Sequence, residues 1–487
     1  MNRIERDLRV VVIGAGMAGI LVGIRLLAQG HRNFAIYEKA ASLGGTWREN
    51  TYPGLTCDVP SHAYTYSFEP NPDWTSEMPA GPEIRAYFER TAQKYGVASA
   101  IAFGEEVIEC AYRDGQWHIA TQRGTRDTAD VVIAATGILH HPAYPAIEGL
   151  ESFAGACFHS ARWDHSVPLD GKRIGVIGSG STGVQIVSAL VPRAARLSHF
   201  QRTAQWIMPA TNEPYSEELK DRLRRDPELL KQMQNDPAYV EMAWGWSEAV
   251  VDATSPMMEQ TEAYALANLE SCVADPVLRE KLRPDHRAGC KRLVRSTDYY
   301  QAIQHPNATL VTEAIARIEP AGLRTADGTL HELDVLVLAT GFHAHQFMRP
   351  MNVTGRNGVA LNDVWAKRPT AYLSLSVPEF PNFFMLNGPT SPVGNFSLID
   401  VAERQWAYVE QLLALLADGS AREIAASADA LARYEQQRIE AARNTVWASG
   451  CNSWYLDAEG VPASWPWSYR RFAEEMTRPR LEDYEIG

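Results

Sequence analysis

Two glycine-rich turns carry residues suited to binding a charged ligand. They are Gly14–Gly19 and Gly178–Gly183, both of the form G-x-G-x-x-G, and each lies between a short apolar run and a helix-compatible run. In such a turn the glycines allow the bend, the approach of a pyrophosphate and close helix–strand packing. Free N–H groups at the helix N-terminus then bind the phosphates. One such motif is weak, but two in the same strand–turn–helix context predict two dinucleotide sites.

The residue that ends the strand after each turn differs in charge between the two copies. Glu38 follows Gly19 by nineteen residues, and Arg202 follows Gly183 by the same interval. A carboxylate there accepts hydrogen bonds from ribose hydroxyls, whereas a guanidinium pairs with a 2′-phosphate. Each could be an ordinary surface charge, but the equal spacing favours ligand binding. We therefore expect FAD or NAD at the first turn and NADP at the second, an arrangement suited to hydride transfer from NADPH to FAD.

The composition limits the partners of the chain. It has 487 residues, 45% of them apolar and 22% charged, with a net charge of −13. A surface this acidic disfavours nucleic acid and anionic membranes. The apolar run from Val10 to Ile24 is shorter than the roughly 20 residues that span a bilayer, and it has no clear cleavage site for a signal peptide. We expect a cytoplasmic protein without membrane insertion.

The six cysteines form no C-x-x-C pair and no zinc-type cluster. This spacing indicates a reducing compartment, no disulfide framework and no metal site. We expect neither Cys57 nor Cys290 to have a partner cysteine.

The arrangement of apolar runs predicts an α/β fold with two Rossmann-like dinucleotide-binding domains and an inserted helical region. The FAD-binding domain is expected to be discontinuous, with residues 1–145 and 380–487. The NADP-binding domain takes residues 150–213 and 290–379. The charged, glycine-poor stretch 214–289 is expected to form the helical insertion.

Several motifs resemble those of type I Baeyer–Villiger monooxygenases, within the flavin-containing monooxygenase superfamily. The most specific is F-x-G-x-x-x-H-x-x-x-W-[PD], complete here from Phe153 to Asp164 with His159 at its centre. The resemblance covers nearly the whole chain. Its further motifs are Gly44–Asp58, Cys290–Arg292 with Asp298–Tyr300, Ala135–Gly137, Ala339–Phe342, Pro381–Pro389 and Cys451–Tyr455.

Two places depart from the pattern of the best-known family members. Arg48 and Glu49 stand where many members have aromatic residues, and the residues after Trp454 look more like the branch that accepts aryl or otherwise bulky ketones. Both departures bear on the substrate more than on the reaction class.

The resemblance implies an NADPH- and O₂-dependent enzyme that converts a ketone to an ester or lactone through a flavin C4a-peroxide. It assigns catalytic roles to Arg292, as the cation near the peroxyanion, and to Asp58, which holds that guanidinium. It places Lys291, Arg202 and Thr203 at the 2′-phosphate and Trp454 over the nicotinamide cofactor. His159, in the linker, is expected to be a hydrogen-bonding strut or switch and not a base.

The expected cofactor-binding residues combine the two turns with the positions that the resemblance indicates. They are Gly14, Gly16, Gly19, Glu38, Lys39, Gly45, Thr46, Trp47, Asp58, Tyr64, Val107, Gly178, Ser179, Gly180, Ser181, Thr182, Gly183, Gln185, Arg202, Thr203, Lys291, Arg292 and Trp454.

Other functions remain open at this level. An N- or S-oxygenating flavin monooxygenase is the nearest alternative. A pyridine-nucleotide disulfide reductase would need a redox cysteine pair at short spacing, and a nucleotide sensor would not need Asp58 or Arg292. The expected partners are a small ketone and O₂, and the expected assembly is a monomer or homodimer.

Overall fold

The structure, a computed structural model that describes residues 6–394 and 396–487, contains two five-stranded parallel sheets. The first has the order β19-β7-β1-β2-β3. Its strands are β1 (Val10–Ile13), β2 (Phe34–Glu38), β3 (Ile101–Phe103), β7 (Val131–Ala134) and β19 (Phe383–Met385). Every residue of β1 is buried, which a central parallel strand requires on both faces. Helix α1 (Met17–Ala28) follows the first glycine turn and packs on this sheet.

The second sheet repeats this arrangement in the order β13-β10-β9-β17-β8. Its strands are β8 (Ala156–His159), β9 (Arg173–Ile177), β10 (Arg196–Phe200), β13 (Ala308–Val311) and β17 (Val335–Leu338). Helix α4 (Ser181–Leu190) follows the second glycine turn. In both sheets the strand before the turn is central, with the strand after the helix beside it. The expected α/β fold with two Rossmann-like units is confirmed.

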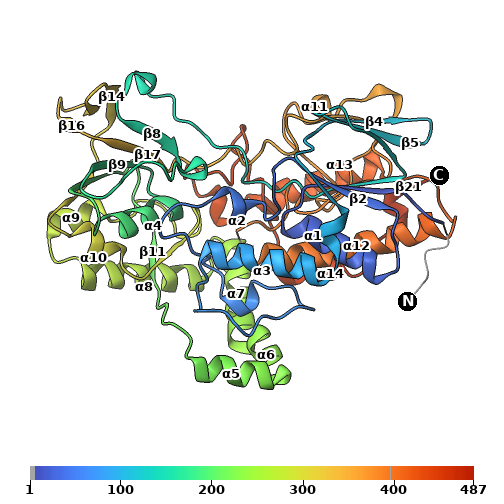
Figure 1. Ribbon diagram of the computed structural model, residues 1–487, viewed down its shortest axis with the longest axis horizontal. Helices are drawn as coiled ribbons and strands as arrows, with labels where there is room; N and C mark the ends of the chain where they lie inside the picture. The colour runs from blue at the N-terminus through green and yellow to red at the C-terminus, as the bar shows by residue number, and fades with distance from the viewer. Residues whose placement is uncertain (1–5, 395) are drawn as a thin grey trace.

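The two sheets form separate lobes, and Figure 1 shows the lobe of β9 and α4 opposite the lobe of β2 and α1. The chain crosses between them twice, and the two crossings lie side by side. Ala143 N–H donates to Gly341 O at 2.9 Å, and His343 N–H donates to His141 O at 2.9 Å. The two connections are therefore bonded to each other.

A smaller sheet extends the first lobe and shows where the chain returns to it. It has the order β18-β4-β5-β6, with β4 (Val107–Arg113), β5 (Gln116–Thr121), β6 (Arg126–Ala129) and β18 (Asn352–Thr354). We expected residues 290–379 in the NADP-binding domain, but β18 pairs with β4, and Met348 and Trp365 are buried with Val132 and Phe383. This stretch lies with the first lobe because its apolar residues are buried against one face of the first sheet. The chain thus rejoins the first lobe near Met348.

The stretch expected to form a helical insertion is helical. Its helices are α5 (Glu217–Arg225), α6 (Pro227–Gln234), α7 (Pro237–Val250), α8 (Pro256–Cys272) and α9 (Pro276–Lys281). The last four begin with proline, preceded by Asp or Ser, the pattern that favours helix initiation.

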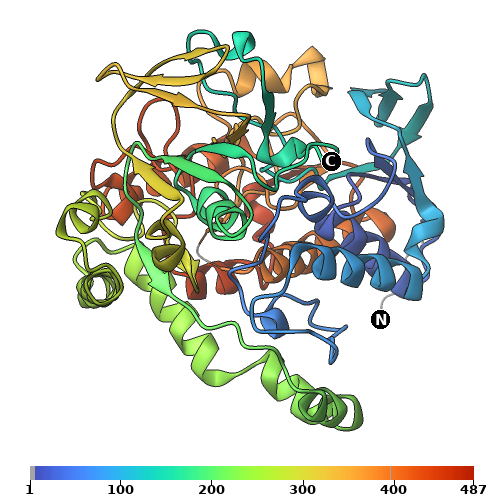
Figure 2. The ribbon, with the colours of Figure 1, turned by 60° about the vertical axis from the view of Figure 1, so that its left-hand side comes forward.

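The insertion reaches from the second lobe to the first. Figure 2 shows the light-green helices of the insertion along the lower edge of the molecule, below blue segments of the first lobe. Gln234 Nε2 donates to Tyr66 O at 2.9 Å, and Arg224 pairs with Asp73 at 2.7 Å.

The remaining elements complete the two lobes. They are α2 (Thr46–Glu49), α3 (Gly81–Lys94), α10 (Tyr299–Ile303), α11 (Leu361–Val364), α12 (Leu398–Ala417), α13 (Ala428–Ala442), α14 (Tyr469–Glu475), β11 (Ile207–Pro209), β12 (Val294–Ser296), β14 (Ile315–Glu319), β15 (Gly322–Thr325), β16 (Leu330–Glu332), β20 (Ile424–Ala426) and β21 (Tyr484–Ile486). Within residues 6–394 and 396–487, no helix combines the length and apolar character needed to cross a membrane.

Candidate active site

The first glycine turn is closed so tightly that only glycine fits. Gly14 has φ +102°, and a Cβ there would lie 2.6 Å from the carbonyl oxygen of Ala135. A Cβ on Gly19 would lie 1.8 Å from the carbonyl oxygen of Gly14. Because real Cβ atoms do not approach oxygen this closely, the turn can be built only without side chains at these positions.

The second turn has the same construction. Gly178 has φ +118°, and a Cβ there would lie 2.2 Å from the carbonyl oxygen of Ala339. A Cβ on Gly183 would lie 1.9 Å from the carbonyl oxygen of Gly178. Each turn therefore contacts the alanine of an Ala-Thr-Gly motif, and each presents the N-terminus of a helix to a phosphate-sized ligand.

Glu38 ends β2 beside the first turn and is 4% exposed. Its carboxylate accepts hydrogen bonds from Ala15 N–H at 2.8 Å and Ala40 N–H at 2.9 Å. Arg48 Nη1 lies 3.0 Å from the same carboxylate. The acid is therefore held in place beside the turn, as the ribose of an unphosphorylated adenosine requires.

Arg202, at the equivalent position beside the second turn, is exposed and forms no ion pair within the described residues. It lies close enough to Lys291 to affect it. Burial lowers the pKa of Lys291, and the charge of Arg202 lowers it further. Asp285 acts in the opposite direction, but within the described residues neither cation forms an ion pair, so the two fit an anion such as a 2′-phosphate.

One cavity of about 1380 Å³ joins the two turns. All the residues that we expected at the cofactors line it except Gly19 and Gly183. Those two glycines instead allow each helix to pack against its own turn, as the Cβ distances above show. The cavity also takes in Asn452 and Ser453 near the C-terminus.

Asp58 and Arg292 meet in this cavity as a bidentate ion pair. Arg292 Nε donates to Asp58 Oδ2 at 2.9 Å, and Nη2 donates to Oδ1 at 2.6 Å. The Asp58 charge raises the pKa of Arg292 against the effect of burial, so the guanidinium stays charged. The Arg292 side chain retains 36% of its accessible surface, and it lines the cavity. A fixed cation thus faces the enclosed space.

Tyr455 stands against the same guanidinium and was not among the expected site residues. Its side chain is 3% exposed and its hydroxyl faces Arg292. Burial raises its pKa, so the phenol stays neutral, and its oxygen can accept a hydrogen bond from the guanidinium. A Cβ on Gly394 would lie 2.0 Å from the Tyr455 hydroxyl oxygen, so this glycine makes room for the phenol. The quoted motif Cys451–Tyr455 contains Tyr455, but nothing in its spacing assigns the residue a partner.

Two further residues that the sequence did not single out connect the lobes at the cavity. The Tyr52 hydroxyl donates to Gln185 Oε1 at 2.9 Å, and Gln185 Nε2 donates to Thr56 O at 3.1 Å. Arg295 Nη1 donates to the backbone oxygen of Asp58 at 3.1 Å. Tyr52 lies in the quoted Gly44–Asp58 motif, but its partner is on α4, which only the fold brings near.

His159 is a strut between the linker and the second Ala-Thr-Gly turn. Its ring is fully buried, Nδ1 accepts from Ala161 N–H at 3.1 Å, and Nε2 donates to Gly341 O at 3.0 Å. Burial lowers its pKa. A neutral ring with both nitrogens engaged matches the strut that we expected.

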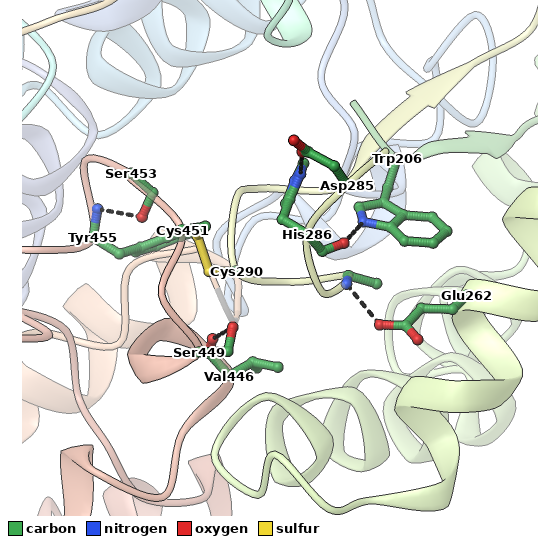
Figure 3. Close-up of a disulfide and its surroundings, with 11 residues drawn as sticks. Trp206, Glu262, Asp285, His286, Cys290, Val446, Ser449, Cys451, Ser453 and Tyr455 are labelled. Carbon is green, nitrogen blue, oxygen red and sulfur yellow. Dashed lines mark hydrogen bonds and ion pairs between the residues drawn. A yellow bond between two sulfur atoms is a disulfide. The ribbon is translucent and has the colours of Figure 1, made fainter. Parts of the chain in front are cut away.

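The expectation that Cys290 has no partner cysteine is wrong. Cys290 forms a disulfide with Cys451, with a Cα–Cα distance of 6.3 Å and a sequence separation of 161 (Figure 3). Only the fold brings these residues together, because the return to the first lobe places the C-terminal loop beside the Lys291–Arg292 segment. Cys57 remains a free, buried thiol.

Known proteins match this chain over nearly its full length. A family described as "Flavin-binding monooxygenase-like" matches residues 7–234. An uncharacterized monooxygenase of Mycobacterium tuberculosis is 45% identical over 98% of this chain and 96% of its own length. A Baeyer–Villiger monooxygenase of Streptomyces coelicolor is 38% identical over 100% of this chain and 94% of its own. The chain belongs to the Baeyer–Villiger monooxygenases.

Solved structures agree with this assignment of the family. Oxidized steroid monooxygenase bound to NADP has a TM-score of 0.86 at 29% identity, covering 98% of this chain and 99% of that one. The expected family, fold and reaction class are therefore confirmed. As a Baeyer–Villiger monooxygenase, the protein is an FAD-containing, NADPH-dependent enzyme.

Proposed function

We propose that this Baeyer–Villiger monooxygenase inserts oxygen beside the carbonyl of an apolar ketone at the Asp58–Arg292 pair. The observation that carries the proposal is the position of this pair, in the cavity that joins the two glycine turns. Val393, Phe396 and Leu398 give the same cavity an apolar wall. An aryl or otherwise bulky ketone, suggested by the sequence after Trp454, remains our prediction for the substrate.

The first turn, with Glu38, holds FAD, and the second, with Arg202, holds NADPH. When bound there, NADPH would supply the hydride and FAD the electrons for the activation of O₂. The helix N-termini of α1 and α4 bind the two pyrophosphates. Lys291, Arg202 and Thr203 bind the 2′-phosphate, and Trp454 covers the nicotinamide cofactor.

Arg292 binds the negative charge that develops as oxygen adds to the carbonyl carbon. Its bidentate pairing with Asp58 fixes the guanidinium plane, and the Tyr455 hydroxyl also contacts it. A cation placed in advance costs no reorganisation at the moment of reaction, and losing one such partner raises the barrier by about 2.7–4 kcal/mol.

We assign the enzyme to the cytoplasm, as a monomer or homodimer. Light scattering of the purified protein measures this assembly directly.

The test is aerobic incubation of the FAD-loaded enzyme with NADPH and a panel of cyclic, aryl and steroid-like ketones, followed by product mass analysis. We expect one ester or lactone for each NADPH consumed. Formation of sulfoxides or N-oxides alone from a matched panel of sulfides and amines would overturn the proposal.

The matched variants are Arg292→Ala and Arg283→Ala. The first should lose about 100-fold or more of ester formation while keeping its flavin. Arg283 forms surface ion pairs with Glu270 and Glu280 outside the cavity, so its variant should retain activity. An active Arg292→Ala enzyme would remove the role assigned to this arginine.

A further inference from the structure

Two loops from distant parts of the sequence form adjoining walls of the cavity. The first precedes β12 and contributes Lys291 and Arg292. The second, near the C-terminus, contributes Asn452, Ser453 and Trp454. In the proposed function, these walls hold the 2′-phosphate, the oxygenation site and the cover over the nicotinamide.

The first loop is fixed to the helical insertion and to Trp206, the residue before β11. The Trp206 indole N–H donates to His286 O at 2.7 Å. Ala288 N–H donates to Glu262 Oε1, on α8, at 2.9 Å. Figure 3 shows these bonds on the side of the loop away from the C-terminal segment. These hydrogen bonds do not involve the cysteines, so they anchor the first loop independently of the disulfide.

The second loop is held by Ala463, whose N–H donates to Tyr455 O at 2.7 Å, and by His345. The ring Nε2 lies 2.9 Å from Trp454 O and 3.0 Å from Leu456 O, and since both are acceptors this nitrogen carries the proton. Within the loop, Tyr455 N–H donates to Ser453 Oγ at 3.3 Å. The loop is thus anchored near Trp454, while its start at Cys451 depends on other contacts.

Between the two loops, the disulfide is the covalent connection. Among the described residues, no backbone hydrogen bond joins residues 285–293 to residues 446–456. The other connections are the contact of the Tyr455 hydroxyl with Arg292 and a shared apolar cluster, which contains Ala288 of the first loop and Val446, Trp447 and Tyr455 of the second. Breaking the sulfur–sulfur bond would leave the start of the second loop without a covalent attachment to the first.

The two sulfurs differ in accessibility. Cys290 is fully buried, whereas Cys451 is half-buried and lies between the exposed residues Gly450 and Asn452. A reductant in solution therefore reaches Cys451 first. Cys57 and Cys110 are buried and distant in sequence from this pair, and they remain thiols.

We propose that Cys290 and Cys451 form a reversible redox site. In its oxidised state, the disulfide links the loop that contains Trp454 to the loop that contains Lys291 and Arg292. This inference rests on the proposed function, because it assigns the two linked loops to NADPH binding and oxygenation. Disulfides in intracellular proteins are commonly transient or redox-sensing.

The chemistry balances with reagents of known class. On oxidation the two thiols lose two protons and two electrons to hydrogen peroxide, the sulfur–sulfur bond forms and two waters leave. A flavoenzyme that consumes NADPH without oxygenating its substrate releases that hydrogen peroxide. On reduction a dithiol attacks Cys451, the Cys290 thiolate leaves, and a second thiol of the reductant releases Cys451 as a thiol.

The disulfide-bonded enzyme binds NADPH more tightly than the reduced enzyme, because the loop that covers the nicotinamide is ordered before the cofactor arrives. It also encloses the oxygenation site better, so more of the NADPH consumed yields ester. The reduced enzyme, in which Cys290 and Cys451 are thiols, binds NADPH more weakly and releases more hydrogen peroxide.

The test compares two samples of the FAD-loaded wild-type enzyme. One is treated with dithiothreitol and desalted without oxygen, and the other is treated with a slight excess of hydrogen peroxide. Peptide mass mapping without reduction establishes the state of the pair. We expect the Michaelis constant for NADPH, measured as NADPH oxidation, to be about tenfold higher in the reduced sample. The yield of ester per NADPH should fall on reduction and recover on reoxidation.

Two variants locate the effect. Cys451→Ser should behave like the reduced enzyme after either treatment. Cys157→Ser removes the exposed free thiol and should switch as the wild type does. Switching that persists in Cys451→Ser, or that disappears in Cys157→Ser, would overturn the proposal, and the wild-type comparison stands even if Cys451→Ser fails to fold.

The outcomes separate this proposal from the proposed function. Ester formed with equal Michaelis constants and yields in both states, after mapping has shown that the bond opened and closed, refutes the redox site alone. Oxidised enzyme without a Cys290–Cys451 crosslink does the same. Absence of ester with every ketone in both states refutes the proposed function, while the NADPH measurement still reports on the disulfide.

Discussion

The two glycine turns share a backbone but hold their discriminating side chains in opposite ways. Glu38 is buried and bonded to two backbone N–H groups and to Arg48. Arg202 is exposed and forms no ion pair in the described part of the chain. The acidic site is organised before its ligand arrives, as suits a cofactor that stays bound. The basic site completes its contacts only when the phosphate arrives, as suits a cofactor that exchanges at each turnover.

The largest difference should come from alanine at the first glycine of each turn. In Gly14→Ala the new Cβ meets the Ala135 carbonyl, and φ +102° adds strain of roughly 1–2 kcal/mol. We expect this variant to be purified without flavin. Gly178→Ala should keep its flavin and lose its response to NADPH. Flavin absorbance and anaerobic bleaching by NADPH measure both, and loss of flavin from both variants alike would contradict the division of roles.

Removing the exposed cation should change one cofactor and spare the other. Arg202→Ala should raise the Michaelis constant for NADPH by about 10- to 100-fold, the value of a charged hydrogen bond of about 1.5–3 kcal/mol. The constant for NADH should not change, because NADH has no 2′-phosphate. Arg196→Ala, at the start of β10, is the control and should leave both constants alone. Equal effects on NADPH and NADH would show that Arg202 does not contact the phosphate.

Removing the charge of the buried Glu38 should have a smaller effect, confined to flavin binding. Glu38→Gln keeps one acceptor oxygen but loses the charge that Arg48 and the two N–H groups bind, a loss of about 1–3 kcal/mol. We expect FAD to dissociate at lower urea concentration than from the wild type, as flavin fluorescence reports. A raised Michaelis constant for NADPH, with flavin retention unchanged, would be the opposite of this expectation.

The smallest effect should be a dependence of NADPH binding on pH. The pKa of Lys291 is lowered by burial and by Arg202, so its ammonium is lost at lower pH than that of an ordinary lysine, about 10.4. As pH rises through this lowered pKa, the Michaelis constant for NADPH should rise a few-fold, while that for NADH stays level. Lys291→Met should abolish the rise, and a rise of equal size in that variant would exclude Lys291 as its source.

Sequence reasoning located residues correctly where the information is local, while their roles at the cofactors stay predictions. The glycine turns, Glu38 and Arg202 follow from spacing within one strand–turn–helix–strand unit. Asp58 and Arg292 were paired through family resemblance, because nothing local connects residues so far apart in the chain. The structure then placed the two within hydrogen-bonding distance.

What sequence reasoning missed depends on contacts between distant segments. The Cys290–Cys451 bond and the Tyr52–Gln185 hydrogen bond each join different parts of the fold. The early return to the first lobe at Met348 was missed because its apolar residues show no periodicity that names their partner sheet. These features follow from the assembled surfaces and not from any single motif.

The second lobe lies, in sequence, between two parts of the first lobe, and this order has a consequence for biosynthesis. The first sheet begins at Val10 but lacks its edge strand until Phe383–Met385 has emerged, and α12 follows later still. The second sheet is complete once Leu338 has left the ribosome. The lobe that starts later therefore finishes earlier, and the first lobe must wait, incompletely covered, while the second folds.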